Sequence, residues 1–292
     1  PTIAILSIGQ MGLGISRLLI AHHYPIITNI SSRSPSTQAR AKSANITCVS
    51  SDVELVKEAD YVFSIVPPRD AVATAQRIVD AMKDREGENV REGKTEPLYY
   101  LDLNAIAPST SRYIAALFEK EAPSIRVIDG GIIGGPPTLP SPSSSESITW
   151  TRPGIPISGP YLLPSPELAS LLNMRYLNPQ IGAASGLKCT FAAMGKGFIA
   201  LSLQSYTTAS ALEILPDLQF YLDTYNPSAR QKAEKGITGC PSKAYRWVEE
   251  MRQIGLCFAE DGGWGKRANV FEGVAGVYEG LALVVERRGE EG

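Results

Sequence analysis

The sequence predicts an α/β protein: a doubly wound, mostly parallel sheet, then a long linking helix and an all-α C-terminal domain. Three observations predict this arrangement. Short apolar segments alternate with helical ones from the N-terminus to Asp129, which is typical of a parallel sheet covered by helices. A glycine-rich turn joins the first strand to the first helix. From Ser185 onward the pattern is helical almost to the end of the chain.

The strands are predicted from short runs rich in Ile, Val, Leu and aromatic residues. The first run, residues 2–8, leads into the glycine turn and an apolar helix that reaches about His22. Pro67 and Pro68 stop a later strand, and Pro108 precedes a helix over residues 109–119. Residues 136–146 are rich in Pro and Ser and predict an exposed loop. The predicted strands are residues 2–8, 26–31, 59–66, 98–103, 125–129, 148–150 and 155–159.

The segment from Ser185 to about Leu212 contains no proline and predicts an unusually long helix. We expect it to connect two domains: a nucleotide-binding domain over residues 1–182 and a helical domain over residues 183–292. Within the second, breaks are expected near Asn226-Pro227, Gly239–Pro241 and Gly262-Gly263.

Composition limits the function classes. The formal net charge is −2 and no stripe of basic and aromatic residues is present, so we expect neither nucleic acid nor a membrane surface as a partner. No uninterrupted run of eighteen apolar residues occurs, and the N-terminus runs directly into a strand. We therefore expect a cytoplasmic protein. The four cysteines are scattered and the only histidines are His22 and His23, so no metal site is expected.

The turn after the first strand carries the first functional pattern. It reads Ser7-Ile8-Gly9-Gln10-Met11-Gly12, which matches the dinucleotide-binding fingerprint except that Ser7 replaces the first glycine. Gly9 lets the backbone approach a pyrophosphate, and Gly12 allows close packing of helix on strand. The amides at the start of the helix then face the phosphates. We expect a dinucleotide to bind here.

The end of the second strand indicates which dinucleotide. NAD enzymes usually carry an acidic residue there for the ribose hydroxyls, and this chain has none. Arg33 can instead hold a 2′-phosphate in a bidentate manner, and Ser32, Ser34 and Thr37 can donate hydrogen bonds. The sequence therefore predicts NADP(H), with a strong preference for NADPH over NADH.

Five segments in series resemble the β-hydroxyacid dehydrogenases, the superfamily of 3-hydroxyisobutyrate and 6-phosphogluconate dehydrogenases. The resemblance covers about residues 2–210, and residues 243–251 look like the helical domain of an uncharacterised branch. The five segments are Gly9–Gly12, Ser64-Ile65-Val66-Pro67-Pro68, Asp102–Pro108, Asp129–Gly135 and Gly182–Lys188.

The resemblance implies a Rossmann domain, a long helix and a helical domain through which the protein forms a homodimer. It also implies residue roles. Lys188 falls on the catalytic lysine, whose pKa desolvation beside the nicotinamide can lower, so that it acts as general acid or base. Asn104 falls where the family contacts the nicotinamide ribose or the substrate. Val66, Pro67 and Pro68 lie along the cofactor.

Two departures from the family pattern concern the substrate. Where the family has Ser-Gly-Gly for a substrate carboxylate, this chain has Ile133-Gly134-Gly135. The backbone amides of that segment remain available, but the hydroxyl is replaced by an apolar side chain. Ala192 stands where the family carries a substrate-binding asparagine. Arg246 is a candidate for a replacement anion site, although a helix-face arginine packed beside aromatic residues explains it equally well.

Three functions follow. The first is an NADP-dependent oxidoreductase that transfers hydride between the nicotinamide and a small hydroxyacid-like or carbonyl substrate. The second is an imine or carbonyl reductase on the same scaffold, since imine reductases share this architecture and have apolar residues at the position of Ile133. The third is a non-catalytic NADP-binding protein, against which the retained Lys188 argues.

Overall fold

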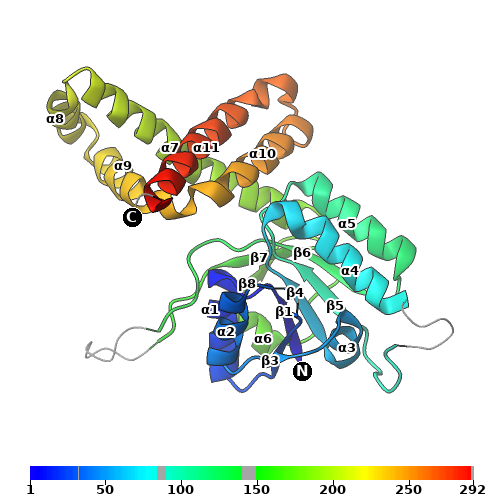
Figure 1. Ribbon diagram of the computed structural model, residues 1–292. Helices are drawn as coiled ribbons and strands as arrows, with labels where there is room; N and C mark the ends of the chain where they lie inside the picture. Colours follow the sequence, from blue (N-terminus) through cyan, green and yellow to red (C-terminus); the bar gives the residue numbers. More distant parts are fainter. Residues whose placement is uncertain (32, 84–89, 140–148, 291–292) are drawn as a thin grey trace. The chain divides into compact units, whose positions relative to one another are not determined.

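The computed structural model describes residues 1–31, 33–83, 90–139 and 149–290. The chain divides into two compact units, Pro1–Lys188 (unit 1) and Cys189–Gly292 (unit 2). Unit 1 contains a sheet with helices on both faces, and unit 2 is helical (Figure 1). The predicted fold class is confirmed.

Unit 1 is built on an eight-stranded sheet in the order β3-β2-β1-β4-β5-β6-β7-β8. All neighbouring strands are parallel except β6 and β7. The first six strands thus follow the order of the doubly wound dinucleotide-binding fold. The strands are β1 (Ile3–Leu6), β2 (Ile26–Thr28), β3 (Thr47–Cys48), β4 (Tyr61–Ser64), β5 (Tyr99–Asp102), β6 (Arg126–Gly130), β7 (Ile155–Ser158) and β8 (Met174–Tyr176).

Alternate side chains of the strands enter two separate apolar cores. Ile3 and Ile5 of β1 face helices α1, α2 and α6, whereas Ala4 and Leu6 face α3, α4 and α5 (Figure 1). This is the expected result of the two-residue period of a strand covered on both faces. The helices of unit 1 are α1 (Gln10–Ala21), α2 (Pro35–Ser43), α3 (Asp52–Glu58), η1 (Pro68–Asp70), α4 (Ala71–Lys83), α5 (Pro108–Glu121) and α6 (Pro166–Leu171).

The segment after β6 differs from the expectation. Residues 149–150 do not form a strand, and residue 148 lies outside the described residues, as does most of the predicted loop over residues 136–146. An isolated bridge joins Thr138 to Thr151, and Ile133 pairs with Gly154. The sheet is completed instead by β7 and β8. The three-residue β8 is too short for its periodicity to be recognised in the sequence.

Unit 2 and the long helix follow the predicted pattern. Helix α7 spans Ala183–Ala211, close to the predicted range. Helix α8 (Leu215–Tyr225) ends just before Asn226, and α9 (Pro227–Gly239) ends before η2 (Pro241–Lys243). Helix α10 (Ala244–Glu260), the turn η3 (Gly265–Asn269) and α11 (Val270–Glu290) complete the chain, and α10 and α11 pack against each other.

One stretch of unit 2 has the length and composition of a membrane-spanning helix, although it contains no uninterrupted run of eighteen apolar residues. Residues 265–289 are long and apolar enough, by length and composition alone, to cross a membrane. Their mean hydropathy is 1.3, and 28% of the most apolar eighteen-residue stretch is buried. The sequence lacks an uninterrupted apolar run here because Glu272 and Glu279 punctuate it. In the mean hydropathy, the low values of these two residues are outweighed by those of the surrounding Val, Leu and Ala.

Candidate functional site

The carboxyl ends of β1, β4, β5 and β6 bring four of the predicted segments to one edge of the sheet. These strands are adjacent and parallel, so the segments that follow them leave the sheet on the same side. Ligands of open α/β sheets bind at this edge. The segments are the glycine turn, Val66–Pro68, Asn104 and the Gly131–Gly135 segment.

The glycine turn fits a phosphate group. Helix α1 begins at Gln10, its first turn carries no acidic residue, and among the described residues no side chain caps it. A Cβ on Gly9 would meet no described atom within 4 Å, so the backbone is open to a ligand there. A Cβ on Gly12 would overlap the carbonyl oxygen of Ser7, so only glycine permits this packing. Gln10 is exposed, whereas Met11 packs against the core.

The start of α2 carries the predicted 2′-phosphate residues. The Ser34 hydroxyl lies 3.0 Å from that of Ser36 and 3.1 Å from that of Thr37, and it accepts from the Thr37 amide. Arg33 is exposed beside them. Ser32 lies outside the described residues.

Sequence reasoning missed one cation in this group. Arg40 donates from Nη2 to the Thr37 hydroxyl at 2.9 Å, because long helical side chains lean toward the N-terminus of their helix. The spacing of three residues between Thr37 and Arg40 on one helix face could have identified it. Arg40 thus contacts the Thr37 hydroxyl, and Arg33 directly precedes Ser34 in the chain.

Asn104 is held in place by its neighbours. It is 2% exposed, its side-chain oxygen accepts from the Val66 amide at 2.7 Å, and its side-chain nitrogen donates to the Ser64 hydroxyl at 2.9 Å. These bonds connect the ends of β4 and β5 and fix the backbone at Val66. Pro67 is exposed and Pro68 is buried at the start of η1.

Asp102, at the end of β5, binds the backbone of Asn104. One of its carboxylate oxygens accepts from the Asn104 amide at 3.0 Å, and the other is buried with no partner among the described residues. Burial raises the pKa of Asp102 to about 7, against the Asn104 hydrogen bond, which lowers it.

Lys188 lies at the end of β6. Its Nζ donates to the carbonyl oxygen of Ile132, and its side-chain stem crosses Gly131. A Cβ on Gly131 would lie 2.8 Å from the Cβ of Lys188, so glycine is required at that position. Within unit 1 the structure therefore brings Lys188 to the same segment as the predicted substrate residues Ile133, Gly134 and Gly135.

These three residues differ in exposure. Ile133 is half-buried, whereas Gly134 and Gly135 are exposed. Gly134 has a φ of +119°, a conformation that favours glycine.

In unit 2, the Nε of Arg246 is buried and has no hydrogen-bond partner within the described part of the chain. Lys196, on α7, forms an ion pair with Glu250 of α10 and lies 5.2 Å from the centre of the Trp247 ring. Lys196 is therefore used within the helical packing, whereas Arg246 keeps one donor that its own unit does not satisfy.

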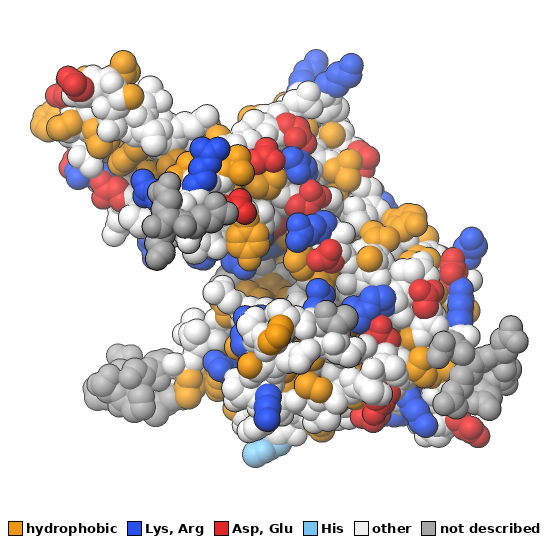
Figure 2. Space-filling view, viewed as in Figure 1, with side chains coloured by type: hydrophobic (Ala, Val, Ile, Leu, Met, Phe, Trp, Pro, Cys, Tyr) orange, Lys and Arg blue, Asp and Glu red, His pale blue; other side chains and the backbone are white. Residues whose placement is uncertain are grey.

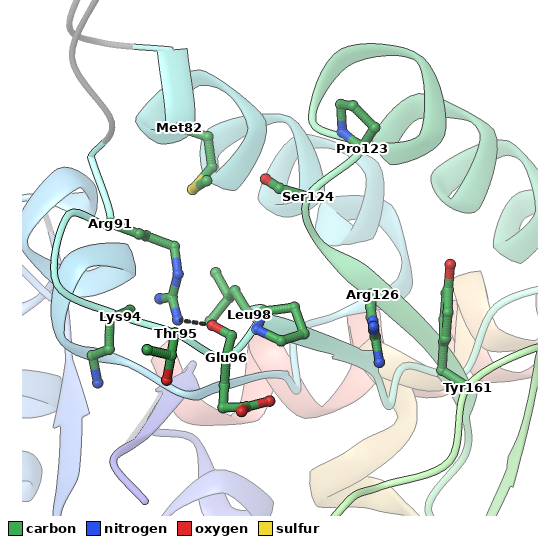
Figure 3. A pocket seen from close by; sticks show the side chains of 11 residues that line it. Met82, Arg91, Lys94, Thr95, Glu96, Leu98, Pro123, Ser124, Arg126 and Tyr161 are labelled. Atoms are coloured by element: carbon green, nitrogen blue, oxygen red, sulfur yellow. Dashed lines mark hydrogen bonds between the residues drawn. The ribbon is translucent and has the colours of Figure 1, made fainter.

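A pocket of about 450 Å³ lies at the opposite edge of the sheet, beside the amino ends of β5 and β6 (Figure 3). Its cations are already engaged. Arg91 donates to the carbonyl oxygens of Val56, Ala59 and Glu96, and Lys94 pairs with Asp60 at 2.7 Å. Arg126 donates to the Tyr99 hydroxyl, and its guanidinium group lies over the Tyr161 ring, 5.2 Å from the ring centre.

Two family models match the chain. Residues 2–86 match the model described as NADP oxidoreductase coenzyme F420-dependent, and residues 209–281 match a domain of unknown function, DUF1932. No curated protein matches the chain.

Solved structures share the fold over nearly the whole chain. The conserved protein MTH1747, described as of unknown function and similar to 3-hydroxyacid dehydrogenases, is 23% identical, with 98% of this chain and 99% of that one covered and a TM-score of 0.64. The 3-hydroxyisobutyrate dehydrogenase of Mycobacterium tuberculosis with L-serine is 15% identical, with 97% and 94% covered and a TM-score of 0.64. The imine reductase of Myxococcus stipitatus with NADP+ is 15% identical, with 100% and 94% covered and a TM-score of 0.55.

The N-terminal match defines the class: this is an NAD(P)-dependent oxidoreductase, and NADP(H) is confirmed as the cofactor type. The predicted resemblance is confirmed as well. The chain joins an NADP-binding domain to a DUF1932 domain, on the fold of the 3-hydroxyisobutyrate dehydrogenases and imine reductases.

Proposed function

We propose that this protein transfers hydride between NADP(H) and a small hydroxyacid-like or carbonyl substrate, with Lys188 as general acid or base. The observation that carries the proposal is the position of Lys188. Its amine donates to the Ile132 carbonyl just after the carboxyl end of β6. That end lies at the same edge of the sheet as the glycine turn, which follows the carboxyl end of β1.

The chain's own residues fit the cofactor at two places. The uncapped start of α1 and the open backbone at Gly9 suit the pyrophosphate. Arg33 and Arg40, with the hydroxyls of Ser34 and Thr37, suit a 2′-phosphate. When bound, NADP(H) supplies or accepts the hydride.

Lys188 moves the proton. During reduction the ammonium group gives a proton to the oxygen of the substrate carbonyl, and during oxidation the neutral amine takes the hydroxyl proton. The Ile132 carbonyl orients the amine by accepting one of its three possible hydrogen bonds. The amides of Gly134 and Gly135 are candidates for the substrate carboxylate, and Arg246 is a candidate for a second anion contact.

Reduction of imines or less polar carbonyls is the second candidate function, and the apolar character of the substrate segment favours it. Ile133 is half-buried and its side chain offers no polar group. A substrate segment of this kind would accept an apolar substrate at lower desolvation cost than a hydroxyacid.

A substrate panel separates these functions. NADPH absorbance would be followed with 3-hydroxyisobutyrate and related hydroxyacids, with 1-pyrroline, and with cyclohexanone plus allyl amine. We expect turnover of at least one class, and a kcat at least about a hundredfold lower in Lys188→Ala. Lys188→Arg keeps the positive charge, but arginine is not deprotonated near neutral pH, so this variant should be equally impaired.

Two results would contradict the proposal. Tight NADPH binding without turnover of any panel member would favour a non-catalytic NADP-binding protein. An unchanged rate in Lys188→Ala would remove Lys188 from the chemistry.

We also propose that unit 2 forms a homodimer. Helix α11 exposes large apolar side chains, mostly near its C-terminal end, and α7 and α8 expose others; part of this surface is visible as orange side chains over α8 in Figure 2. A second copy of the same chain would cover such surfaces symmetrically. The exposed residues on α11 are Val270, Leu283, Val284 and Val285.

A further inference from the structure

The carboxylate of Asp129, near the end of β6, is fully buried and accepts six hydrogen bonds. Three come from backbone amides at the start of α7, those of Gly182, Ala184 and Ser185, at 2.9–3.2 Å. Three come from hydroxyls that lie far apart in the sequence. The hydroxyl donors are Ser111 of α5, Ser158 of β7 and Ser185 of α7.

Such a site is built to hold a negative charge. A buried carboxylate is costly unless its oxygens are saturated by donors, and here backbone and hydroxyl groups supply them. The first turn of a helix offers unsatisfied amides and the positive end of its dipole. Asp129 therefore fixes the start of α7 against β6, β7 and α5.

Lys188 is one helical turn beyond this anchor. It follows Ser185 by three residues, and Gly131, which its stem crosses, follows Asp129 by two. The anchor and the lysine thus connect the same two segments. The chain packs these segments closely, since a Cβ on Gly131 would lie 2.8 Å from Lys188. A shift of α7 at Asp129 must carry the Lys188 amine with it.

We propose that Asp129 is a positioning residue for Lys188: its carboxylate binds the first turn of α7 and so fixes the amine at the end of β6. The proposal rests on the function proposed above for Lys188. Asp129 itself takes no proton from the substrate.

The test compares Asp129→Asn with the wild-type protein. The amide is the same size, but it retains only one acceptor oxygen and places N–H donors against the amides of α7. Lysines would be labelled by reductive methylation with 13C-formaldehyde, and the Lys188 signal would be assigned by its absence in Lys188→Arg. We expect this signal to shift in Asp129→Asn. With 3-hydroxyisobutyrate, or cyclohexanone plus allyl amine, we expect kcat to fall about tenfold to a hundredfold while the NADPH KM changes less than about twofold.

Asp102→Asn is the matched control. Asp102 is the residue paired with Asp129 on the neighbouring strand, it is equally buried, and it accepts a hydrogen bond from the Asn104 amide rather than from α7. Its substitution should leave the Lys188 signal in place. An equal shift in both variants would overturn the proposal, because it would show a general response to substitution of a buried carboxyl group.

The remaining outcomes are distinguishable. A folded Asp129→Asn protein with an unchanged Lys188 signal and unchanged kcat would overturn the positioning role. If Lys188→Ala keeps full activity while Asp129→Asn still moves the Lys188 signal, the proposed function fails and the positioning role stands. If Asp129→Asn does not fold, Ser158→Ala and Ser185→Ala replace it, since each removes one hydroxyl donor to Asp129. The proposal then predicts a shifted Lys188 signal and a lowered kcat in both variants, and an unchanged signal and kcat would overturn it.

Discussion

Residues 1–188 bury their apolar side chains far more completely than residues 189–292 do. Both large clusters of buried apolar residues lie in unit 1. Fourteen of the twenty large apolar side chains found exposed lie in unit 2, although it is the shorter unit. The sheet of unit 1 is covered on both faces by its own helices, whereas the helices of unit 2 leave apolar faces without cover.

This difference separates two tasks. Unit 1 is complete as a folded body, so its exposed edge can serve ligand binding with backbone amides, hydroxyls and cations. Unit 2 exposes the apolar side chains through which we propose that two copies associate. Substitutions in unit 1 should therefore change cofactor binding or folding, and substitutions in unit 2 should change association.

The largest expected effect is on association. Leu283→Glu combined with Val284→Glu places two charges on the exposed apolar face of α11, and we expect a dimer dissociation constant at least about a hundredfold higher. Size-exclusion chromatography with light scattering at several concentrations would measure it. Leu162→Glu, at a residue 59% exposed in unit 1, is the control and should remain dimeric. Identical masses for all three proteins, with wild-type protein floating with lipid vesicles, would assign this face to a membrane instead.

The two glycines of the turn should separate folding from binding. Gly12→Ala must move the Ser7 carbonyl and should lower the free energy of unfolding by about 2–3 kcal/mol. Gly9→Ala meets open space, so stability should stay constant while NADPH affinity falls about tenfold or more. Thermal unfolding and NADPH fluorescence titration would measure the two. Unchanged affinity in Gly9→Ala would argue against a dinucleotide at this turn.

Arg33, just before α2, and Arg40, on α2, should set cofactor preference. Arg33→Ala and Arg40→Ala should each weaken NADPH binding about tenfold, the scale of a lost charge-assisted hydrogen bond, and leave NADH binding unchanged. Lys42→Ala, on the last turn of the same helix, controls for general loss of positive charge. Equal losses for NADPH and NADH would contradict a 2′-phosphate site.

The smallest effect concerns pH. Asp102 has its pKa raised to about 7 by burial, so between pH 4 and 7 the folded state binds more protons than the unfolded state. The contribution of Asp102 to stability is therefore present at low pH and falls by about 1 kcal/mol per pH unit between pH 5 and 7. Urea unfolding at pH 5, 6, 7 and 8 would show this slope in the wild-type protein and a flatter one in Asp102→Asn. Parallel slopes would show that Asp102 titrates normally.

Features with a local physical cause could be predicted from the sequence. The strand before Pro67 was predicted because a buried parallel strand reads as a continuous apolar run. The long helix was predicted from the absence of proline between Ser185 and Leu212. Arg40 was not predicted, although its spacing of three residues from Thr37 is local, because a single arginine on a polar helix has no distinctive sequence pattern.

Features that depend on partners distant in the chain could not be predicted. Asn104 was predicted as a ligand contact from its family position, but its hydrogen bonds to Val66 and Ser64, which lie 38 and 40 residues away, could not be predicted. β3 and β8 are too short to show a period and become strands only by pairing with β2 and β7.

The sequence was enough to place most of the strands and helices and the glycine turn, because periodicity and backbone sterics act over a few residues. It also indicated NADP, because side-chain type at the end of the second strand decides which ribose substituent can be bound. Only the tertiary structure decided how Lys188 is held. Its anchor, Asp129, collects hydroxyls and amides from residues 18 to 56 positions away, and no local pattern encodes which of these meet.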